Sequence, residues 1–184
     1  MGITTLDQRT ALVLIDLQRG IAGSPESGPV VATAARLAEG FRALGLPVVL
    51  VNVSGGAPGR VERPRPGGAR PEGWDELLPE IGDGIRITKR TWGAFHGTDL
   101  HDRLQAEGVT QVVLGGISTS KGVESTARGA HEHGYNVTVA IDAIRDNDSE
   151  AHENSVERIF PVLGETGTSA EILEVLADVV RAAE

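Results

Sequence analysis

The sequence contains no cysteine among its 184 residues. The chain therefore cannot form a disulfide, bind a metal through thiolates or use a cysteine nucleophile. It also contains no apolar run long enough to cross a bilayer. Residues 1–9 lack the pattern of basic residues followed by apolar ones that marks a secretory signal. These absences predict a cytoplasmic protein.

Positive charge is also scarce, with 17 Lys and Arg against 26 Asp and Glu and a formal net charge of −9. This balance disfavours a nucleic acid or an anionic membrane as partner. Neither GxGxxG after a strand nor GxxxxGK[ST] occurs, so the nucleotide-binding motifs are missing and no cofactor is expected. The length, with 40% apolar residues, predicts a single domain over residues 1–184.

Short apolar runs alternate with stretches of helical periodicity along the chain. We expect strands at residues 11–15, 48–53, 85–88, 112–114, 135–141 and 160–163. We expect helices at residues 30–44, 74–81, 98–107, 121–133 and 149–158, and a last one from 168 or 169. This alternation predicts an α/β fold, a Rossmann-like three-layer α/β/α sandwich around a mostly parallel sheet of about six strands.

The stretch QVVLGGISTSKGVESTAR, residues 111–128, predicts a sharp turn from a buried strand into a helix. Gly115 and Gly116 are expected to end the strand, and Lys121 to begin the helix. The unpaired N–H groups and the positive dipole end of a new helix suit a developing anion. Gly122 occupies the position where such an elbow usually carries its most important side chain.

Asp16 and Lys89 each follow a separate predicted strand, and Gly122 follows a third. Because the carboxyl ends of parallel strands meet at one sheet edge, we expect these residues to converge there. A carboxyl group beside an ammonium group could perform acid–base catalysis, with the elbow amides binding an oxyanion. Residue spacing alone is equally compatible with a structural ion pair at the rim.

The motifs resemble those of the isochorismatase-like hydrolase superfamily along nearly the whole chain. The matching segments are ALVLIDLQ (11–18), KRTWGAF (89–95), GTDL (97–100), GIST (116–119), VESTAR (123–128) and GYNV (134–137). The resemblance implies a six-stranded parallel sheet in a three-layer sandwich, which agrees with the pattern of elements above.

Most proteins of this superfamily hydrolyse amides with an Asp–Lys–Cys triad. The resemblance implies Asp16 and Lys89 as the first two members, whereas the cysteine position is Gly122. True isochorismatases look similar and carry glycine there; they hydrolyse a vinyl ether with an acidic proton donor. The resemblance thus implies that Asp16 donates a proton, that Lys89 orients it or binds a substrate carboxylate, and that Gly122 leaves room for substrate. A neighbouring lysine lowers a carboxyl pKa, so burial must outweigh it for Asp16 to act as an acid.

The resemblance also implies a cis peptide bond between Ile117 and Ser118, which would turn the Ser118 N–H toward that of Gly122 as an oxyanion hole. The alternative is an ordinary trans turn. No metal is expected, because Asn52-Val53-Ser54 stands where metal-binding relatives have an Asp-x-His segment.

Further candidate substrate-binding residues are Gln18, Trp92, Ser118 and Thr119. Gln18 could instead hydrogen-bond a neighbouring loop, and Trp92 could simply pack. The elbow hydroxyls, with Ser120 and Ser125, could instead cap the turn, or one could replace the missing thiol if a base lies within reach. The five histidines are scattered and are read as solvated surface residues.

The loop Ser54–Gly73 is long for a connection and predicts a binding loop or lid. Its arginines, at positions 60, 63, 65 and 70, would suit an anionic small-molecule substrate. The alternative to an enzyme is a catalytically silent homologue that binds a small molecule but has lost the triad. A homo-oligomer is expected from the resemblance alone.

Overall fold

A computed structural model describes residues 2–62 and 69–182 of the chain. Its centre is a parallel sheet of six strands in the order β3-β2-β1-β4-β5-β6. The strands are β1 (Thr10–Ile15), β2 (Val48–Val53), β3 (Ile85–Lys89), β4 (Gln111–Ile117), β5 (Asn136–Arg145) and β6 (Glu165–Gly167). The predicted α/β fold with a parallel sheet is therefore confirmed.

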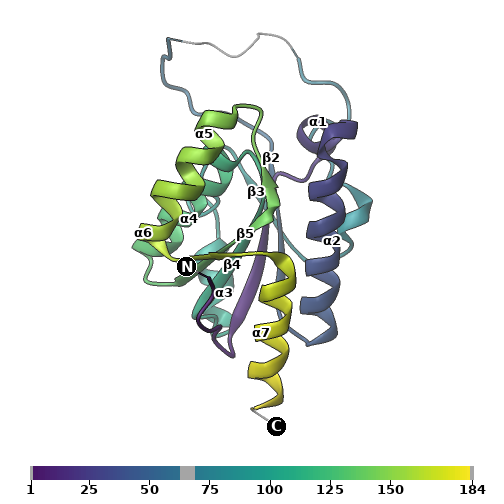
Figure 1. The fold of residues 1–184 in the computed structure, drawn as a ribbon. Helices are drawn as coiled ribbons and strands as arrows, with labels where there is room; N and C mark the ends of the chain where they lie inside the picture. The colour runs from purple at the N-terminus through teal and green to yellow at the C-terminus, as the bar shows by residue number, and fades with distance from the viewer. Residues whose placement is uncertain (1, 63–68, 183–184) are drawn as a thin grey trace.

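Helices cover both faces of the sheet (Figure 1). On one face lie α2 (Gly28–Ala43) and α7 (Ser169–Arg181), and on the other α3 (Leu100–Ala106), α4 (Glu124–Glu132) and α6 (Phe160–Leu163). The shorter elements are α1 (Arg19–Ala22), α5 (Ser149–Asn154), the 3₁₀ turns η1 (Pro25–Ser27) and η2 (Pro79–Ile81), and the π-helical turns η3 (Thr119–Val123) and η4 (Ser155–Ile159). The layers are those of the predicted sandwich.

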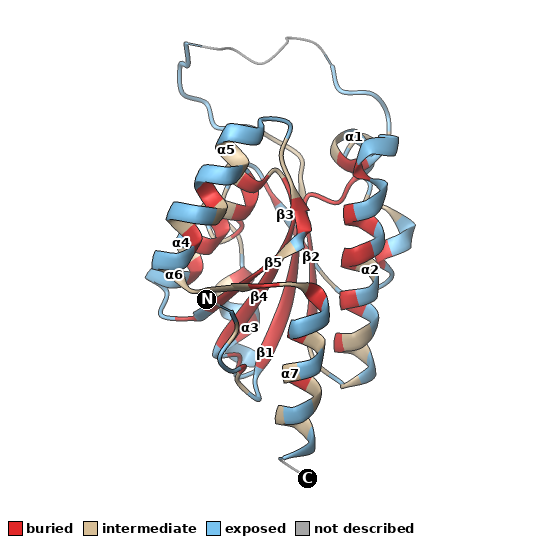
Figure 2. Ribbon diagram, in the orientation of Figure 1, coloured by how far each residue is buried: buried red, intermediate tan, exposed pale blue. Residues whose placement is uncertain are grey.

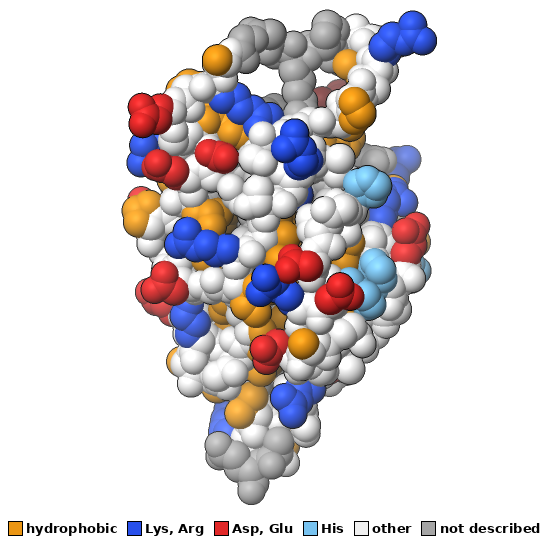
Figure 3. All heavy atoms as spheres, turned by 180° about the vertical axis from the view of Figure 1, so that it is seen from behind, with side chains coloured by type: hydrophobic (Ala, Val, Ile, Leu, Met, Phe, Trp, Pro, Cys, Tyr) orange, Lys and Arg blue, Asp and Glu red, His pale blue; other side chains and the backbone are white. Residues whose placement is uncertain are grey.

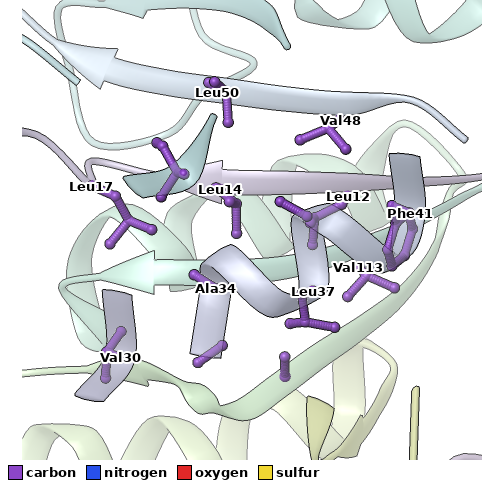
Figure 4. Close-up of a cluster of buried hydrophobic side chains, with 14 of the residues drawn as sticks. Leu12, Leu14, Leu17, Val30, Ala34, Leu37, Phe41, Val48, Leu50 and Val113 are labelled. Carbon is purple, nitrogen blue, oxygen red and sulfur yellow. The ribbon is translucent and has the colours of Figure 1, made fainter. Parts of the chain in front are cut away.

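Strand β1 lies at the centre and is buried on both faces, because successive side chains point to opposite sides of a strand. Leu12 and Leu14 pack with Leu37 and Phe41 of α2 in one core (Figure 4). The alternate residues of β1, including Ile15, join a second core under α3 and α4. Figure 2 shows the result as red strands between helices that are buried only on their inner sides. Burial of each such Leu or Ile side chain stabilises the fold by about 1.5–3 kcal/mol.

The prediction of a strand at residues 160–163 is wrong. Phe160–Leu163 forms α6, and Pro161 lies in its first turn, where the missing N–H of proline removes no helical hydrogen bond. The sixth strand is the shorter β6, which pairs with β5 from Thr138↔Glu165 onward. The apolar composition of residues 160–163 fits either a short buried strand or one buried helical turn, so composition alone does not decide between them.

The structure also differs from prediction at the end of β4 and at residues 74–81. Gly115 and Gly116 do not end β4, which continues to Ile117, so glycine here allows close packing instead: a Cβ on Gly116 would lie 2.1 Å from the carbonyl oxygen of Ile15. The helix expected at residues 74–81 is a turn, an isolated bridge between Gln18 and Leu77, and the 3₁₀ turn η2. Among the described residues, no helix is long and apolar enough to cross a membrane.

Candidate active site

Asp16 follows β1 directly, at the carboxyl edge of the sheet. Its backbone has φ 55°, and it is the only described non-glycine residue with a positive φ. This left-handed conformation is uncommon for residues with a Cβ and is often found at functional sites. The Asp16 N–H donates to the Val51 carbonyl at 2.8 Å, which fixes the turn against β2. Residue spacing gave no signal of this conformation.

Lys89 is the last residue of β3, two strands away from β1. Its long side chain crosses the end of β2, and its Nζ lies 2.9 Å from Asp16 Oδ2. The two side chains are only 1% and 7% exposed, so this is a buried ion pair. Lys89 Nζ also donates to the carbonyl oxygen of Trp92. The predicted convergence of Asp16 and Lys89 is thus present in the structure.

Gly122 lies in the turn η3, with its missing side chain directed at the ion pair. A Cβ built on Gly122 would lie 3.1 Å from Asp16 Oδ2, 3.1 Å from Lys89 Nζ and 2.9 Å from Ile15 Cγ2. Distances this short are tighter than ordinary van der Waals contact. A side chain at Gly122 would therefore collide with Ile15 and with the ion pair, and its absence lets the carboxylate and the ammonium group pack directly against the backbone. The expectation that Gly122 leaves room for substrate is wrong, because the pair already fills that place. We call this position, where Asp16 and Lys89 fill the place of a Gly122 side chain, the glycine hollow.

Burial raises the pKa of Asp16 from 3.8 to about 6, because desolvation outweighs the attraction and hydrogen bond of Lys89. Burial likewise lowers the pKa of Lys89, against the opposing effect of Asp16. Both shifts favour the neutral forms of the pair. Asp16 Oδ1 is buried and has no hydrogen-bond partner among the described residues. The second oxygen of Asp16 is thus a buried acceptor without a partner, and the carboxyl group is able to hold a proton up to about pH 6.

The elbow after β4 combines a cis peptide bond between Ile117 and Ser118 with the π-helical turn η3. The Ser118 carbonyl accepts from the N–H groups of Lys121 and Val123, at 3.2 Å each. A helix was expected from Lys121, but the wider π turn precedes α4. Turns of this kind occur frequently at functional sites.

Two side chains from beyond β5 hold this elbow in place. Asp146 Oδ2 accepts from the backbone N–H of Ser120 at 2.9 Å and from its hydroxyl at 2.7 Å. The Thr119 hydroxyl, fully buried, lies 2.9 Å from His152 Nδ1. Neither Asp146 nor His152 was predicted to belong to the site. Because β5 continues to Arg145 instead of ending near residue 141, it brings both of them to the elbow.

Gln18 uses its amide to join two loops. Its Nε2 donates to the carbonyls of Val53 (3.1 Å) and Trp74 (3.2 Å), and its Oε1 accepts from the Val53 N–H at 2.7 Å. The side chain is fully buried. Of the two roles considered for Gln18, contact with a neighbouring loop is therefore the one the structure displays.

Trp92 is 49% exposed and lines a hollow of about 690 Å³ between its loop and α4. Three of the five histidine positions lie at or beside this hollow; His96 and His133 line it, and His101 stacks on His133 with ring centroids 4.1 Å apart. Figure 3 shows histidine side chains gathered on one side of the molecule. Neither Asp16 nor Lys89 lines this hollow, so the ion pair does not open into it.

Residues 54–62, which follow β2, rise above the carboxyl edge of the sheet (Figure 1). Arg70 links the two sides of the loop between β2 and η2. Its guanidinium lies 3.9 Å from the Trp74 ring centroid and donates to the Gly55 carbonyl at 2.8 Å. Arg60 is exposed. The other two predicted arginines, Arg63 and Arg65, lie outside the described residues.

Asn52 takes part in structural hydrogen bonds at the position considered for a metal. Its Nδ2 donates to the Asp75 carbonyl at 2.9 Å, and its Oδ1 accepts from the Thr88 hydroxyl at 2.8 Å. Within residues 2–62 and 69–182, no group of three or more His, Asp or Glu side chains is arranged to hold a metal ion.

Comparison with known proteins identifies a matching family and several relatives of this chain. Residues 10–171 match the isochorismatase domain. The chain is 44% identical over 180 residues to the isochorismatase family protein YecD of Escherichia coli O157:H7, covering 91% of this chain and 96% of the relative. It is 29% identical over 187 residues to maleamate amidohydrolase of Pseudomonas putida, covering 92% and 87%. A solved isochorismatase family protein from Burkholderia thailandensis matches with a TM-score of 0.90 at 39% identity, covering 94% and 98%.

Proposed function

The chain belongs to the isochorismatase family, and from that membership we propose that it is a small-molecule hydrolase that works without a cysteine nucleophile. The bond we propose it cleaves is a vinyl ether or a similar enol-type bond, with Asp16 as general acid. The observation that carries this proposal is the buried pair of Asp16 and Lys89, which packs against Gly122 so that the acid and the amine fill the place where a thiol would otherwise stand.

The proposed reaction begins with transfer of the Asp16 proton to the terminal carbon of the enol ether. The electron pair of the C=C bond forms the new C–H bond and leaves an oxocarbenium ion. Water then adds to the carbon that bears the oxygen and gives its proton back to Asp16. Collapse of the hemiketal releases an alcohol and a ketone, so one enol ether and one water molecule account for both products. No covalent intermediate with the protein is formed.

Lys89 positions the acid in this proposal. Two of the three donors of its ammonium group contact protein oxygens, Asp16 Oδ2 and the Trp92 carbonyl. We propose that the third donor meets an oxygen of the substrate, such as a carboxylate. Arg70 and Arg60, in the loop above the site, would add favourable potential for an anionic substrate.

The direct test is a panel of enol ethers and amides that carry carboxylates, incubated with the purified protein. We expect release of ketone from an enol ether and no acyl adduct of the protein in mass spectra. A covalent acyl adduct on an elbow hydroxyl would replace this mechanism by serine or threonine catalysis. Binding without turnover across the enol ethers would instead support the silent homologue.

A side chain at Gly122 should lower activity. We expect Gly122→Ala to lower kcat/KM at least about tenfold, because the added methyl group collides with the carboxylate and the ammonium group and displaces them from their alignment. Gly28→Ala is the matched control, since a Cβ at Gly28, in the first turn of α2, would meet nothing within 4 Å. Steady-state kinetics of both variants provides the measurement. Unchanged kcat/KM in Gly122→Ala would show that turnover does not depend on the packing of Asp16 and Lys89 against Gly122.

The pH dependence of kcat/KM should follow the protonated form of Asp16. Because burial raises the pKa of Asp16 to about 6, kcat/KM should be level below that pH and fall as pH rises through it. The limiting slope is about tenfold per pH unit. A rate that instead rises through this range would make Asp16 a base and would contradict the general-acid mechanism.

A further inference from the structure

One short segment, Trp92–Ala94, contacts both halves of the site. The Trp92 carbonyl accepts from Lys89 Nζ on one side. The Ala94 N–H donates on the other side to the hydroxyl of Thr126, at 3.1 Å. Between them, Gly93 lies close to α4: a Cβ there would be 3.3 Å from the Ser125 carbonyl oxygen. The position of this segment is therefore coupled to the ammonium group and to the elbow helix at once.

Thr126 makes the connection to the elbow. Its side chain is fully buried in α4, and its hydroxyl donates to the Gly122 carbonyl at 2.7 Å. The same oxygen accepts from Ala94, so both the donor and an acceptor position of the hydroxyl are used. A threonine that bonds the carbonyl one turn earlier is common in helices and has no catalytic meaning by itself. The unusual feature is the second bond, which leads to the segment that holds Lys89.

We propose that Thr126 is a positioning residue, which fixes the spacing between the Lys89 ammonium group and the glycine hollow through its bonds to Ala94 and Gly122. Its catalytic consequence rests on the proposed function. Without the hydroxyl, two buried polar backbone groups lose a partner, and the Trp92–Ala94 segment is free to move relative to the elbow. Lys89 then moves relative to Asp16 and to the glycine hollow.

The test compares Thr126→Val, which keeps the shape and removes both hydrogen bonds, with Thr126→Ser, which keeps the hydroxyl. Thr138→Val is the matched control: Thr138 is also fully buried and accepts from Gln111 Nε2 at 2.9 Å, but it lies in β5 outside the site. Two readouts are needed, steady-state kinetics on a turned-over enol ether and the pKa of Asp16 from carboxyl-carbon NMR. The second readout requires no substrate.

We expect Thr126→Val to lower kcat by roughly tenfold with KM changed less than about threefold, because alignment is lost and binding groups are kept. The pKa of Asp16 should rise, since Lys89 is the group that lowers it. Thr126→Ser and Thr138→Val should match the unaltered protein in both readouts. Should Thr126→Val not fold, Thr126→Cys, whose thiol is a weaker donor and acceptor, should give a smaller change in the same directions.

The outcomes separate this inference from the proposed function. A shifted Asp16 pKa in Thr126→Val, restored in Thr126→Ser, supports the inference even if no enol ether is turned over. An Asp16 pKa that is unmoved in Thr126→Val overturns it, whatever the substrate. Equal effects in Thr126→Val and Thr138→Val would also overturn it, because they would reduce Thr126 to a general contribution to stability.

Discussion

Replacement of Asp16 by asparagine is expected to lower kcat by roughly 10²–10⁴-fold, the usual contribution of a general acid. Asparagine has nearly the same shape and can still accept a hydrogen bond from Lys89, so the glycine hollow should persist. It has no proton to give to carbon at any accessible pH. The falling limb of the pH profile, which reports the Asp16 carboxyl group, should disappear together with most of the rate.

Asp142→Asn is the matched control for this substitution. Asp142 is a second acid on a buried strand, but its carboxylate accepts from the N–H and the hydroxyl of Ser169, at 2.7 and 2.6 Å, at the start of α7. Turnover by Asp142→Asn should equal that of the unaltered protein. An Asp16→Asn protein that retains full kcat would exclude Asp16 as the proton donor.

Replacement of Lys89 by methionine is expected to move the falling limb of kcat/KM above pH 6. Lys89 opposes the effect of burial on Asp16, so its removal leaves desolvation alone and raises the pKa of Asp16 above about 6. The variant should also be less stable by about 3–5 kcal/mol at pH 8, where a buried carboxylate has lost its partner. Methionine fills a similar volume, so the loss reflects charge more than packing.

The sign of the pH effect on stability follows from the same shift. The folded protein holds the Asp16 proton to a higher pH than the unfolded chain does, so stability falls as pH rises from 3.8 through about 6. In Lys89→Met the pKa of Asp16 in the folded protein is higher still. The unfolding free energy lost on this substitution should therefore be smaller at pH 5 than at pH 8. Urea denaturation at the two pH values measures the loss. An equal loss at both pH values, or an unmoved kinetic limb, would contradict the assigned coupling of the two groups.

The convergence of Asp16, Lys89 and Gly122 was predictable because it depends on topology. Three apolar runs, each followed by a distinctive residue, place those residues at one edge once the strands are parallel. The apolar pattern of residues 11–15 is strong enough to define β1 within one residue of its observed start. The motif resemblance then identified the glycine at the elbow as the position of a missing thiol.

Other features depend on three-dimensional packing that a linear pattern does not encode. Whether burial or Lys89 has the larger effect on the pKa of Asp16 depends on how completely the protein covers the pair. The residue types alone do not predict that coverage. The positive φ of Asp16 and the roles of His152 and Thr126 depend on contacts between distant segments. The strand predicted at residues 160–163 was wrong because buried strands and buried helical turns share the same apolar character.

The most direct measurement is the pKa of Asp16 itself, followed by carboxyl-carbon NMR in the unliganded protein and assigned by comparison with Asp16→Asn. We expect a titration near pH 6, well above the ordinary value of 3.8, because the carboxyl group is buried beside Lys89 at the glycine hollow. A titration at or below 3.8 would mean that the ion pair dominates and that Asp16 carries no proton to donate. That result would contradict the general-acid mechanism.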